Sequence, residues 1–219
     1  MKFDCAIFDL DGTLVDSQRM WTQVKTEVLT SRGIPCTPED ELLLKAMELP
    51  AASQALSRNW PTGLTPEEAM QEVLRSVFYH YGHTVGLKKG SMELLQKLHQ
   101  LGVTCCLGTA SNLDWITPLL QRLGLDRQLD FIVTCQMVGD RNKHFPDCFL
   151  EAARRAGVEP RRAVVFEDAG YSLKAAKSVG FWTVGINEPA ADGTPEELRQ
   201  ICDWFVDDVT QLPESFWSD

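Results

Sequence analysis

The N-terminal segment, residues 3–17, constrains the fold and the chemistry of this chain most strongly. Its residues 5–8 form a short apolar run rich in β-formers, which predicts a strand buried in a parallel sheet. Two carboxylates, Asp9 and Asp11, follow this run, and Gly12 supplies the flexible turn that a strand exit requires. Ligands of open α/β sheets bind beyond the carboxyl ends of the strands, so we expect a site here.

The spacing of Asp9 and Asp11 favours a divalent cation. Extended backbone directs side chains two residues apart toward the same side of the sheet. Two like charges at such a short distance repel each other unless a cation or a proton lies between them. Mg²⁺ prefers oxygen ligands and commonly bridges to a substrate phosphate. For a bare Asp-x-Asp pair, the alternative is a metal-free acidic turn that closes a strand.

The whole run Asp-Leu-Asp-Gly-Thr-Leu-Val-Asp-Ser, residues 9–17, resembles the first signature of the haloacid dehalogenase superfamily, in its phosphatase and phosphomutase branch. The resemblance implies a Rossmann-like parallel sheet and an Mg²⁺ cofactor. It makes Asp9 the nucleophile that carries an aspartyl phosphate. Asp11 would donate a proton to the leaving alkoxide and later take one from water. Asp9, through its carboxylate, and Asp11, through its backbone carbonyl, would also be metal ligands.

Length and composition set the broad class. A chain of 219 residues holds one large domain, or one of about 150 residues with an insertion. A net charge of −10 disfavours nucleic acid and anionic membranes as partners. No apolar run approaches the ~18 residues of a membrane span, and Met1-Lys2 leads into the first strand without a signal peptide. Seven cysteines without regular spacing indicate reduced thiols, so we expect a cytoplasmic protein. Nothing in the sequence indicates an obligate protein partner.

The chain divides by pattern into an α/β part and a helical insertion. Residues 17–85 carry helical periodicity, and Thr37 and Thr65 each begin a helix with a hydroxyl, a proline and acidic residues. We predict a four-helix unit there and an α/β core formed by residues 1–16 and 86–219. The insertion resembles the helical cap of the same superfamily branch, which closes over the site and contacts the leaving group.

Strands and helices alternate after Gly86, which predicts parallel βαβ units with right-handed crossovers. The predicted strands are 103–107, 131–134, 163–166, 182–186 and 204–206. The predicted helices are 91–101, 113–123, 147–156 and 173–179, with Pro118 inside the second. A Rossmann-like sheet follows from this alternation.

Three later strand exits resemble the remaining superfamily signatures. Thr109, with the backbone amide of Ala110, would bind phosphate oxygens while Ser111 or Asn112 caps the next helix. Lys143, from Asn-Lys-His-Phe-Pro-Asp, would offset the repulsion between Asp9 and a phosphate dianion. His144 stands where the family usually has proline.

The last exit, Phe-Glu-Asp, ends at Glu167 and Asp168. Asp168 would complete the metal site, and Glu167 would be either a ligand or an anchor for bound waters. Each of these features alone has a structural explanation, such as a helix cap, a solvated lysine or an acidic helix start. Their order and their places at strand exits favour the superfamily assignment.

The signatures predict an Mg²⁺-dependent phosphatase for small phosphate monoesters, with sugar phosphates as the expected substrates. Dehalogenases lack the second Asp and the metal. A sugar phosphomutase is the main alternative, but such enzymes typically carry a His where Trp21 stands here, and a Gly and an Arg near residues 48–53. A catalytically silent phosphometabolite-binding protein would keep the fold without turnover. A phosphorelay receiver also phosphorylates an aspartate at a parallel sheet, but it needs no insertion after the first strand.

Overall fold

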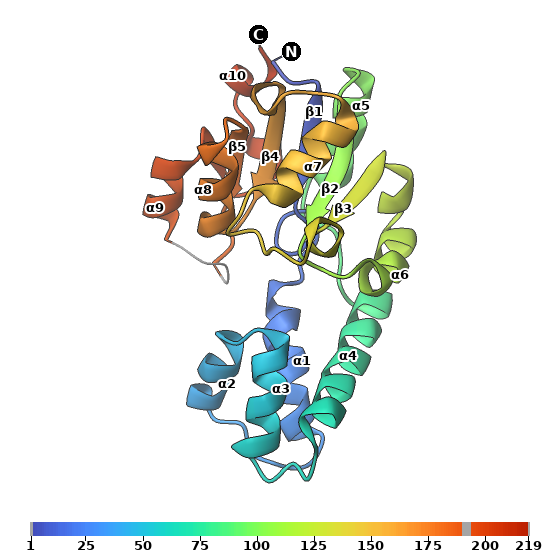
Figure 1. The fold of residues 1–219 in the computed structure, drawn as a ribbon, viewed down its shortest axis with the longest axis vertical. Coiled ribbons are helices and arrows are strands. Elements are labelled where there is room, and N and C mark those ends of the chain that lie inside the picture. Colours follow the sequence, from blue (N-terminus) through green and yellow to red (C-terminus); the bar gives the residue numbers. More distant parts are fainter. Residues whose placement is uncertain (1, 190–193, 219) are drawn as a thin grey trace. The chain divides into compact units, whose positions relative to one another are not determined.

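A computed structural model describes residues 2–189 and 194–218. The chain divides into two compact units, one formed by the residues up to Asp16 together with those from Gly86 onward, and the other by Ser17–Val85. Figure 1 shows the elements of both units in sequence colours.

Within the described residues, six strands form one fully parallel sheet in the order β3-β2-β1-β4-β5-β6. They are β1 (Cys5–Phe8), β2 (Thr104–Thr109), β3 (Phe131–Thr134), β4 (Ala163–Glu167), β5 (Trp182–Ile186) and β6 (Trp204–Val206). These strands are continuous apolar runs because helices cover both faces of a parallel sheet. The prediction of a Rossmann-like parallel sheet is confirmed.

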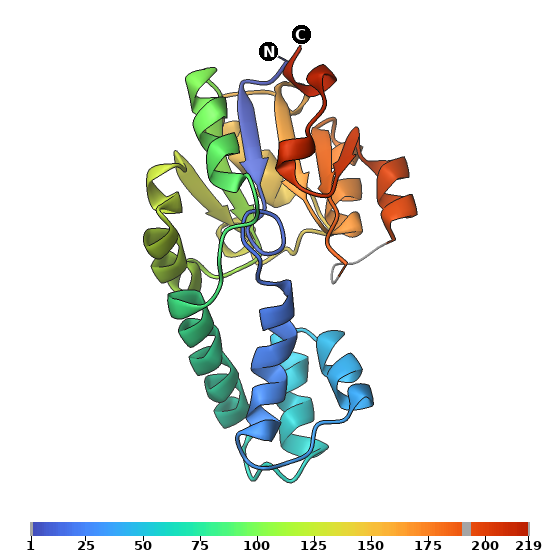
Figure 2. The same cartoon turned by 180° about the vertical axis from the view of Figure 1, so that it is seen from behind.

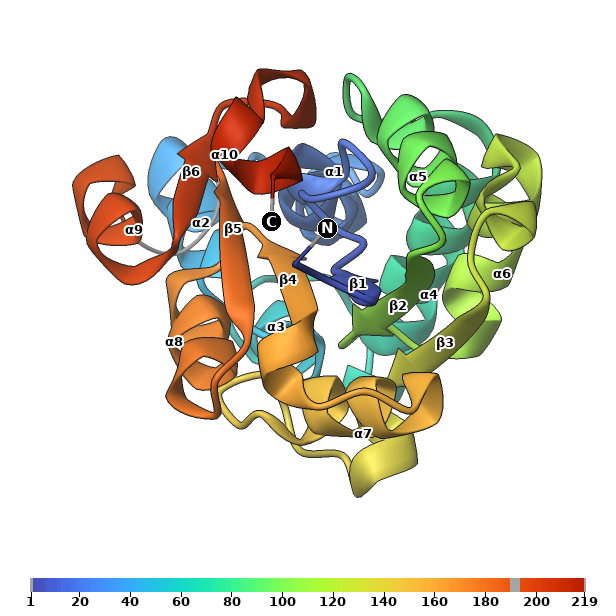
Figure 3. The same cartoon turned by 90° about the horizontal axis from the view of Figure 1, so that it is seen from above.

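Helices cover both faces of this sheet. Figure 3, seen along the strands, shows α7 and α8 on one face and α5 and α10 on the other. The helices of this unit are α5 (Ser91–Gln100), α6 (Leu113–Leu123), α7 (Asp147–Ala156), α8 (Gly170–Ser178), α9 (Pro195–Ile201) and α10 (Glu214–Trp217). Short 3₁₀ turns are η1 (Leu125–Arg127), η2 (Cys135–Val138), η3 (Pro160–Arg162) and η4 (Val209–Gln211). On the α7 face, Phe149 packs with Ile7 and Val165 in one buried apolar cluster.

The second unit consists of α1 (Gln18–Thr30), α2 (Pro38–Lys45), α3 (Leu49–Arg58) and α4 (Pro66–His83). Thr37 and Thr65 accept the backbone N–H of Asp40 and Glu68, whose carboxylates bond back to the caps. These reciprocal bonds explain where α2 and α4 begin. The helices α1 and α4 lie side by side in both views (Figures 1 and 2).

The interior of the helical unit is apolar with one buried cation. Val24 and Val77 are fully buried. Lys25 is also buried, and its Nζ donates to the Leu44 carbonyl at 3.0 Å, near the end of α2. A lysine in that place adds a charged donor to a carbonyl at the C-terminal end of the helix. Trp21 packs edge-on against Tyr81 at a centroid distance of 6.0 Å.

In the part of the chain that the structure describes, no helix combines the length and the apolar composition of a membrane span. The seven cysteines are free thiols, and the Sγ atoms of buried Cys5 and Cys106 lie 3.9 Å apart on neighbouring strands.

Candidate active site

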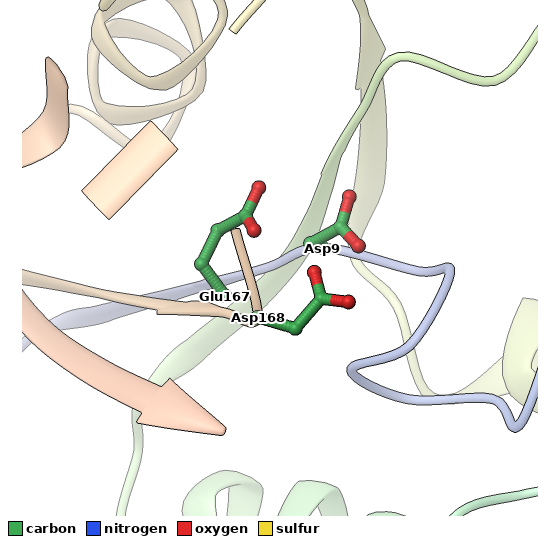
Figure 4. A group of neighbouring side chains, drawn as sticks. All are labelled: Asp9, Glu167 and Asp168. Atoms are coloured by element: carbon green, nitrogen blue, oxygen red, sulfur yellow. The ribbon is translucent and has the colours of Figure 1, made fainter. Parts of the chain in front are cut away.

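Two neighbouring strands at the centre of the sheet end in carboxylates. Asp9 follows β1, and Glu167 and Asp168 lie at the end of β4 (Figure 4). The Asp9 N–H donates to the Phe166 carbonyl at 2.9 Å, which continues the pairing of β1 with β4 beyond the last residue of β1. The chain leaves β1 toward β2 on one side of it, while β4 lies on the other side. Such a switch in strand order opens the crevice where ligands of this sheet type bind.

The three carboxylates form one buried group. One oxygen from each of Asp9, Glu167 and Asp168 lies within 4.8 Å of the other two. All three side chains are almost completely buried. The sequence prediction assigned these residues to the metal site, and the fold brings them together from two strand ends.

Lys143 is the cation of this group. It lies in the loop between η2 and α7, its exposed fraction is 4%, and its Nζ donates to the carboxylates of Asp9 and Glu167. The same Nζ lies 3.4 Å from the Gly108 carbonyl. Lys143 thus contacts the predicted nucleophile directly, as the resemblance implied. A cation between two buried carboxylates compensates charges that would otherwise be very costly to bury.

Glu167 is held by further donors. The Ala169 N–H donates to its Oε2 at 2.9 Å, and the Ser172 hydroxyl donates to its Oε1 at 2.7 Å. Burial opposes the ionised form, but Lys143 and these hydrogen bonds outweigh burial and hold the pKa of Glu167 below its usual value. Glu167 is therefore an ionised anchor for Lys143.

The other three charged groups of the site, Asp9, Asp168 and Lys143, also have shifted pKa values. Burial, with repulsion from Glu167, raises the pKa of Asp9 to about 8 despite the attraction of Lys143. Burial and the same neighbour place the pKa of Asp168 well above its usual range. Burial opposes the charge of Lys143, yet the two carboxylates it contacts raise its pKa well above the usual value.

This group of side chains fits a hard divalent cation. Asp9, Glu167 and Asp168 together with Lys143 carry an excess of two negative charges when all are ionised. Closely spaced buried oxygen donors with that excess are the ligands that Mg²⁺ prefers. Because Glu167 is committed to Lys143 and two other donors, Asp9 and Asp168 are the side chains best placed to bind a metal directly.

Asp11 is held by a side chain from another strand exit. The Ser111 hydroxyl donates to Asp11 Oδ2 at 2.7 Å. Ser111 is free for this contact because Asn112 caps α6, accepting the Asp114 N–H at 3.0 Å. From the sequence, either Ser111 or Asn112 could have been the cap. The role of Ser111 depends on its contact with Asp11. No local sequence pattern encodes a contact between residues so far apart in the chain.

Thr109 and Ala110 lie at the end of β2, beside β1. Thr109 is buried, and its hydroxyl accepts the Ser111 N–H at 3.0 Å. Ala110 is exposed. The preceding Gly108 is needed for space, since a Cβ there would lie 3.0 Å from Ile7 Cγ2. Thr109 and Ala110, which the sequence predicts to bind phosphate, come directly after Gly108 in the chain. The Gly108 carbonyl oxygen lies 3.4 Å from Lys143 Nζ.

A stacked pair fixes the loop of Lys143. The His144 ring lies 4.0 Å from the Tyr171 ring, centroid to centroid, at an interplanar angle of 18°. The His144 N–H also donates to Asn142 Oδ1 at 3.3 Å. These contacts restrain the loop at the position where the family usually has proline. Burial, followed by repulsion from Glu167, raises the pKa of the Tyr171 phenol. No motif in the sequence points to Tyr171.

Comparisons with known proteins identify the family of this chain. The family described as haloacid dehalogenase-like hydrolase matches residues 3–180. Validoxylamine A 7'-phosphate phosphatase of Streptomyces hygroscopicus subsp. limoneus is 30% identical over 186 residues, which cover 84% of this chain and 85% of that protein. Hexitol phosphatase B of Escherichia coli (strain K12) is 24% identical over 210 residues, covering 94% and 93%.

Among solved structures, a candidate beta-phosphoglucomutase from Thermotoga maritima has the same fold. Its TM-score is 0.83 at 22% sequence identity, and the match covers 93% of this chain and 94% of that one. The family match spans most of the chain, and the sequence prediction of a haloacid dehalogenase-type hydrolase is confirmed. This chain therefore belongs to the haloacid dehalogenase-like hydrolases.

Proposed function

We propose that this protein is an Mg²⁺-dependent phosphatase that hydrolyses small phosphate monoesters, with sugar or polyol phosphates as substrates. The observation that carries the proposal is the contact of buried Lys143 with Asp9, beside the carboxylate of Asp168. The substrate class is supported by the names of two relatives, a validoxylamine A 7'-phosphate phosphatase and a hexitol phosphatase.

In this proposal Asp9 attacks the phosphorus in line and carries the phosphoryl group as an aspartyl phosphate. Asp9, Asp168 and the Asp11 backbone carbonyl would hold Mg²⁺, which would supply positive charge to offset the charge of the phosphoryl group. Lys143 adds a fixed ammonium beside Asp9, where charge develops in the transition state. Glu167 keeps that ammonium in place.

Proton transfer falls to Asp11 in this scheme. Its carboxyl donates a proton to the leaving alkoxide and then takes one from the water that hydrolyses the aspartyl phosphate. Ser111 orients this carboxyl. The Thr109 hydroxyl and the Ala110 N–H bind the phosphate oxygens. The net reaction consumes one water and yields the alcohol and inorganic phosphate.

We further propose that the helical unit, residues 17–85, serves as the cap domain of this fold. We also propose that the enzyme acts in the cytoplasm, which the seven free thiols support because reducing compartments preserve them. The expected partner is a small phosphorylated metabolite.

Phosphate release tests the proposal. The substrates are p-nitrophenyl phosphate and a panel of hexose and hexitol phosphates, with and without Mg²⁺. Wild type should release phosphate only with Mg²⁺, and Asp9→Asn should release none. Asp4→Asn is the matched control, because Asp4 is exposed and pairs with Arg162 near the start of β1. Wild type that releases no phosphate, but moves phosphate between positions of one sugar, would favour a mutase instead.

A further inference from the structure

Lys88 connects the loop after β1 with the segment that follows β5. Its Nζ donates to the Gly12 carbonyl at 2.8 Å and to a Glu188 carboxylate oxygen at 2.6 Å. Both charged side chains are mostly buried, with exposed fractions of 16% for Lys88 and 11% for Glu188. The resemblance to known signatures assigns no role to either residue.

The loop that Lys88 contacts is tightly wound. The Leu10 carbonyl accepts the N–H groups of Thr13, Leu14 and Val15 at distances of 3.0 to 3.3 Å. Gly12 adopts a φ of +88°, a conformation that side chains disfavour. Asp11 therefore lies between Leu10, whose carbonyl accepts these three hydrogen bonds, and Gly12, whose carbonyl accepts one from Lys88.

Lys88 holds the same loop through its backbone as well. Its N–H donates to the Leu14 carbonyl at 2.9 Å. The neighbouring Leu87 pairs in antiparallel fashion with Val15, and the Asp16 N–H donates to the Gly86 carbonyl at 3.0 Å. The two chain segments that border the helical unit are thus bonded to each other, and the Lys88 ammonium extends this contact to Gly12.

We infer that Lys88, fixed by Glu188, is a positioning residue that orients Asp11 for proton transfer by holding the Gly12 carbonyl. The inference rests on the proposed function, in which Asp11 protonates the leaving group. The described contacts of the Lys88 ammonium are to Gly12 and Glu188, whereas Asp9 has Lys143 as its cation. Loss of Lys88 should therefore affect proton donation more than attack on phosphorus.

Two kinds of substrate separate these effects. A p-nitrophenolate group leaves without a proton, whereas the alkoxide of a sugar or polyol needs one. The parameter kcat/KM reports the steps up to phosphoryl transfer to Asp9, and so it contains proton donation but not hydrolysis of the aspartyl phosphate. A mispositioned Asp11 should lower kcat/KM selectively for the alkyl phosphate.

The experiment measures kcat/KM with saturating Mg²⁺ for p-nitrophenyl phosphate and for the hexose or hexitol phosphate that wild type hydrolyses fastest. Lys88→Met should lose roughly 10- to 100-fold on the alkyl phosphate and less than about threefold on p-nitrophenyl phosphate. Lys88→Arg, which keeps the charge and the donors, should recover most of the loss. Asp11→Asn should show the same selectivity more strongly.

Lys89→Met is the matched control. Lys89 is the next residue and also forms an ion pair, with Asp208 at 3.0 Å, but its side chain is 72% exposed. It should behave like wild type on both substrates. If Lys88→Met does not fold, Glu188→Gln replaces it, because this change removes the charge that fixes the ammonium while keeping the side-chain shape.

Equal losses on the two substrates, or no loss, would overturn the inference. If Asp11→Asn is selective and Lys88→Met is not, the inference fails while the proposed function stands. If wild type hydrolyses neither substrate, the proposed function itself fails, and the inference fails with it.

Discussion

Removing the ammonium of Lys143 would leave the buried carboxylates of the site without their cation. Its Nζ contacts two buried carboxylates, those of Asp9 and Glu167, and Asp168 lies in the same group. Breaking a buried ion pair by deleting one partner typically costs about 3–5 kcal/mol, because the other charge stays buried without compensation. In a chain of this length, that loss lowers Tm by roughly 6–20 °C. We expect Lys143→Met to show this loss at pH 7 without metal.

The loss should shrink at lower pH. In wild type the pKa of Asp9 is already raised, so the difference between the two proteins comes from Glu167. Without Lys143, burial should raise the folded pKa of Glu167 above its value in the unfolded chain. The folded state then binds protons that the unfolded state has already released, so the stability of the variant rises as pH falls toward about 4–5. In wild type, Lys143 lowers the pKa of Glu167, so the contribution of Glu167 to stability is lost as pH falls, the opposite of the trend in the variant. The difference in Tm between the two proteins should therefore narrow from pH 7 to pH 5.

Thermal unfolding by circular dichroism at both pH values, with a chelator present, provides the measurement. Lys177→Met is the control, because Lys177 pairs with Asp203 at 2.6 Å but is 43% exposed. A surface pair contributes about 0–1 kcal/mol. If Lys143→Met and Lys177→Met lower Tm equally, or if the effect of Lys143→Met does not depend on pH, the assigned balance of buried charges is wrong.

Three further predictions concern the same site. Asp168→Asn should raise the Mg²⁺ concentration for half-maximal phosphate release at least about tenfold, and an unchanged value in a metal titration would remove Asp168 from the metal site. Gly108→Ala should lower the free energy of unfolding by about 1–3 kcal/mol, because the added Cβ meets Ile7 Cγ2 at 3.0 Å. Urea unfolding measures this loss, and unchanged stability would mean that the neighbouring strands shift to make room. Metal-free wild type should lose part of its stability as pH rises from about 4 to about 8, since folded Asp9, with its pKa raised to about 8, keeps a proton that the unfolded chain releases. Urea unfolding at several pH values measures this slope, which saturating Mg²⁺ should flatten; a stability that rises over the same range would contradict the assigned shift.

The sequence predicted the central sheet well because strands buried on both faces are continuous apolar runs. The boundaries were less predictable where tertiary contacts set them. The strand β2 extends to Thr109, two residues past the predicted end, because Thr109 pairs with Thr134 of β3. The helix α8 begins at Gly170 rather than Leu173, since the Ala169 carbonyl already accepts the N–H groups of both Ser172 and Leu173.

The helix α9, which the strand and helix pattern did not predict, nevertheless has a visible signal in the sequence. Thr194 accepts the Glu197 N–H at the start of α9, in a Thr-Pro-Glu-Glu pattern like those at Thr37 and Thr65. The helix was missed because its seven residues show little apolar periodicity. A capping box deserves as much weight as periodicity in short helices.

The candidate site could be predicted where a residue lies within a known signature. Asp9 and Asp168 follow strand ends, whereas Lys143 lies in the loop before α7. Contacts between such exits were not accessible. The bond from Ser111 to Asp11 and the bridge from Lys88 to Gly12 join residues far apart in the chain. Sheet order decides those contacts, and no local pattern encodes it.

The central claim is that Asp9 carries the phosphoryl group during turnover. Protein mixed with substrate and Mg²⁺ can be quenched with sodium borohydride, which reduces an aspartyl phosphate to homoserine, and then digested for peptide mass spectrometry. We predict homoserine at position 9 in wild type and in the Asp4→Asn control, and none without substrate. An enzyme that releases phosphate but forms no homoserine at position 9, or forms it at another aspartate, would contradict the claim.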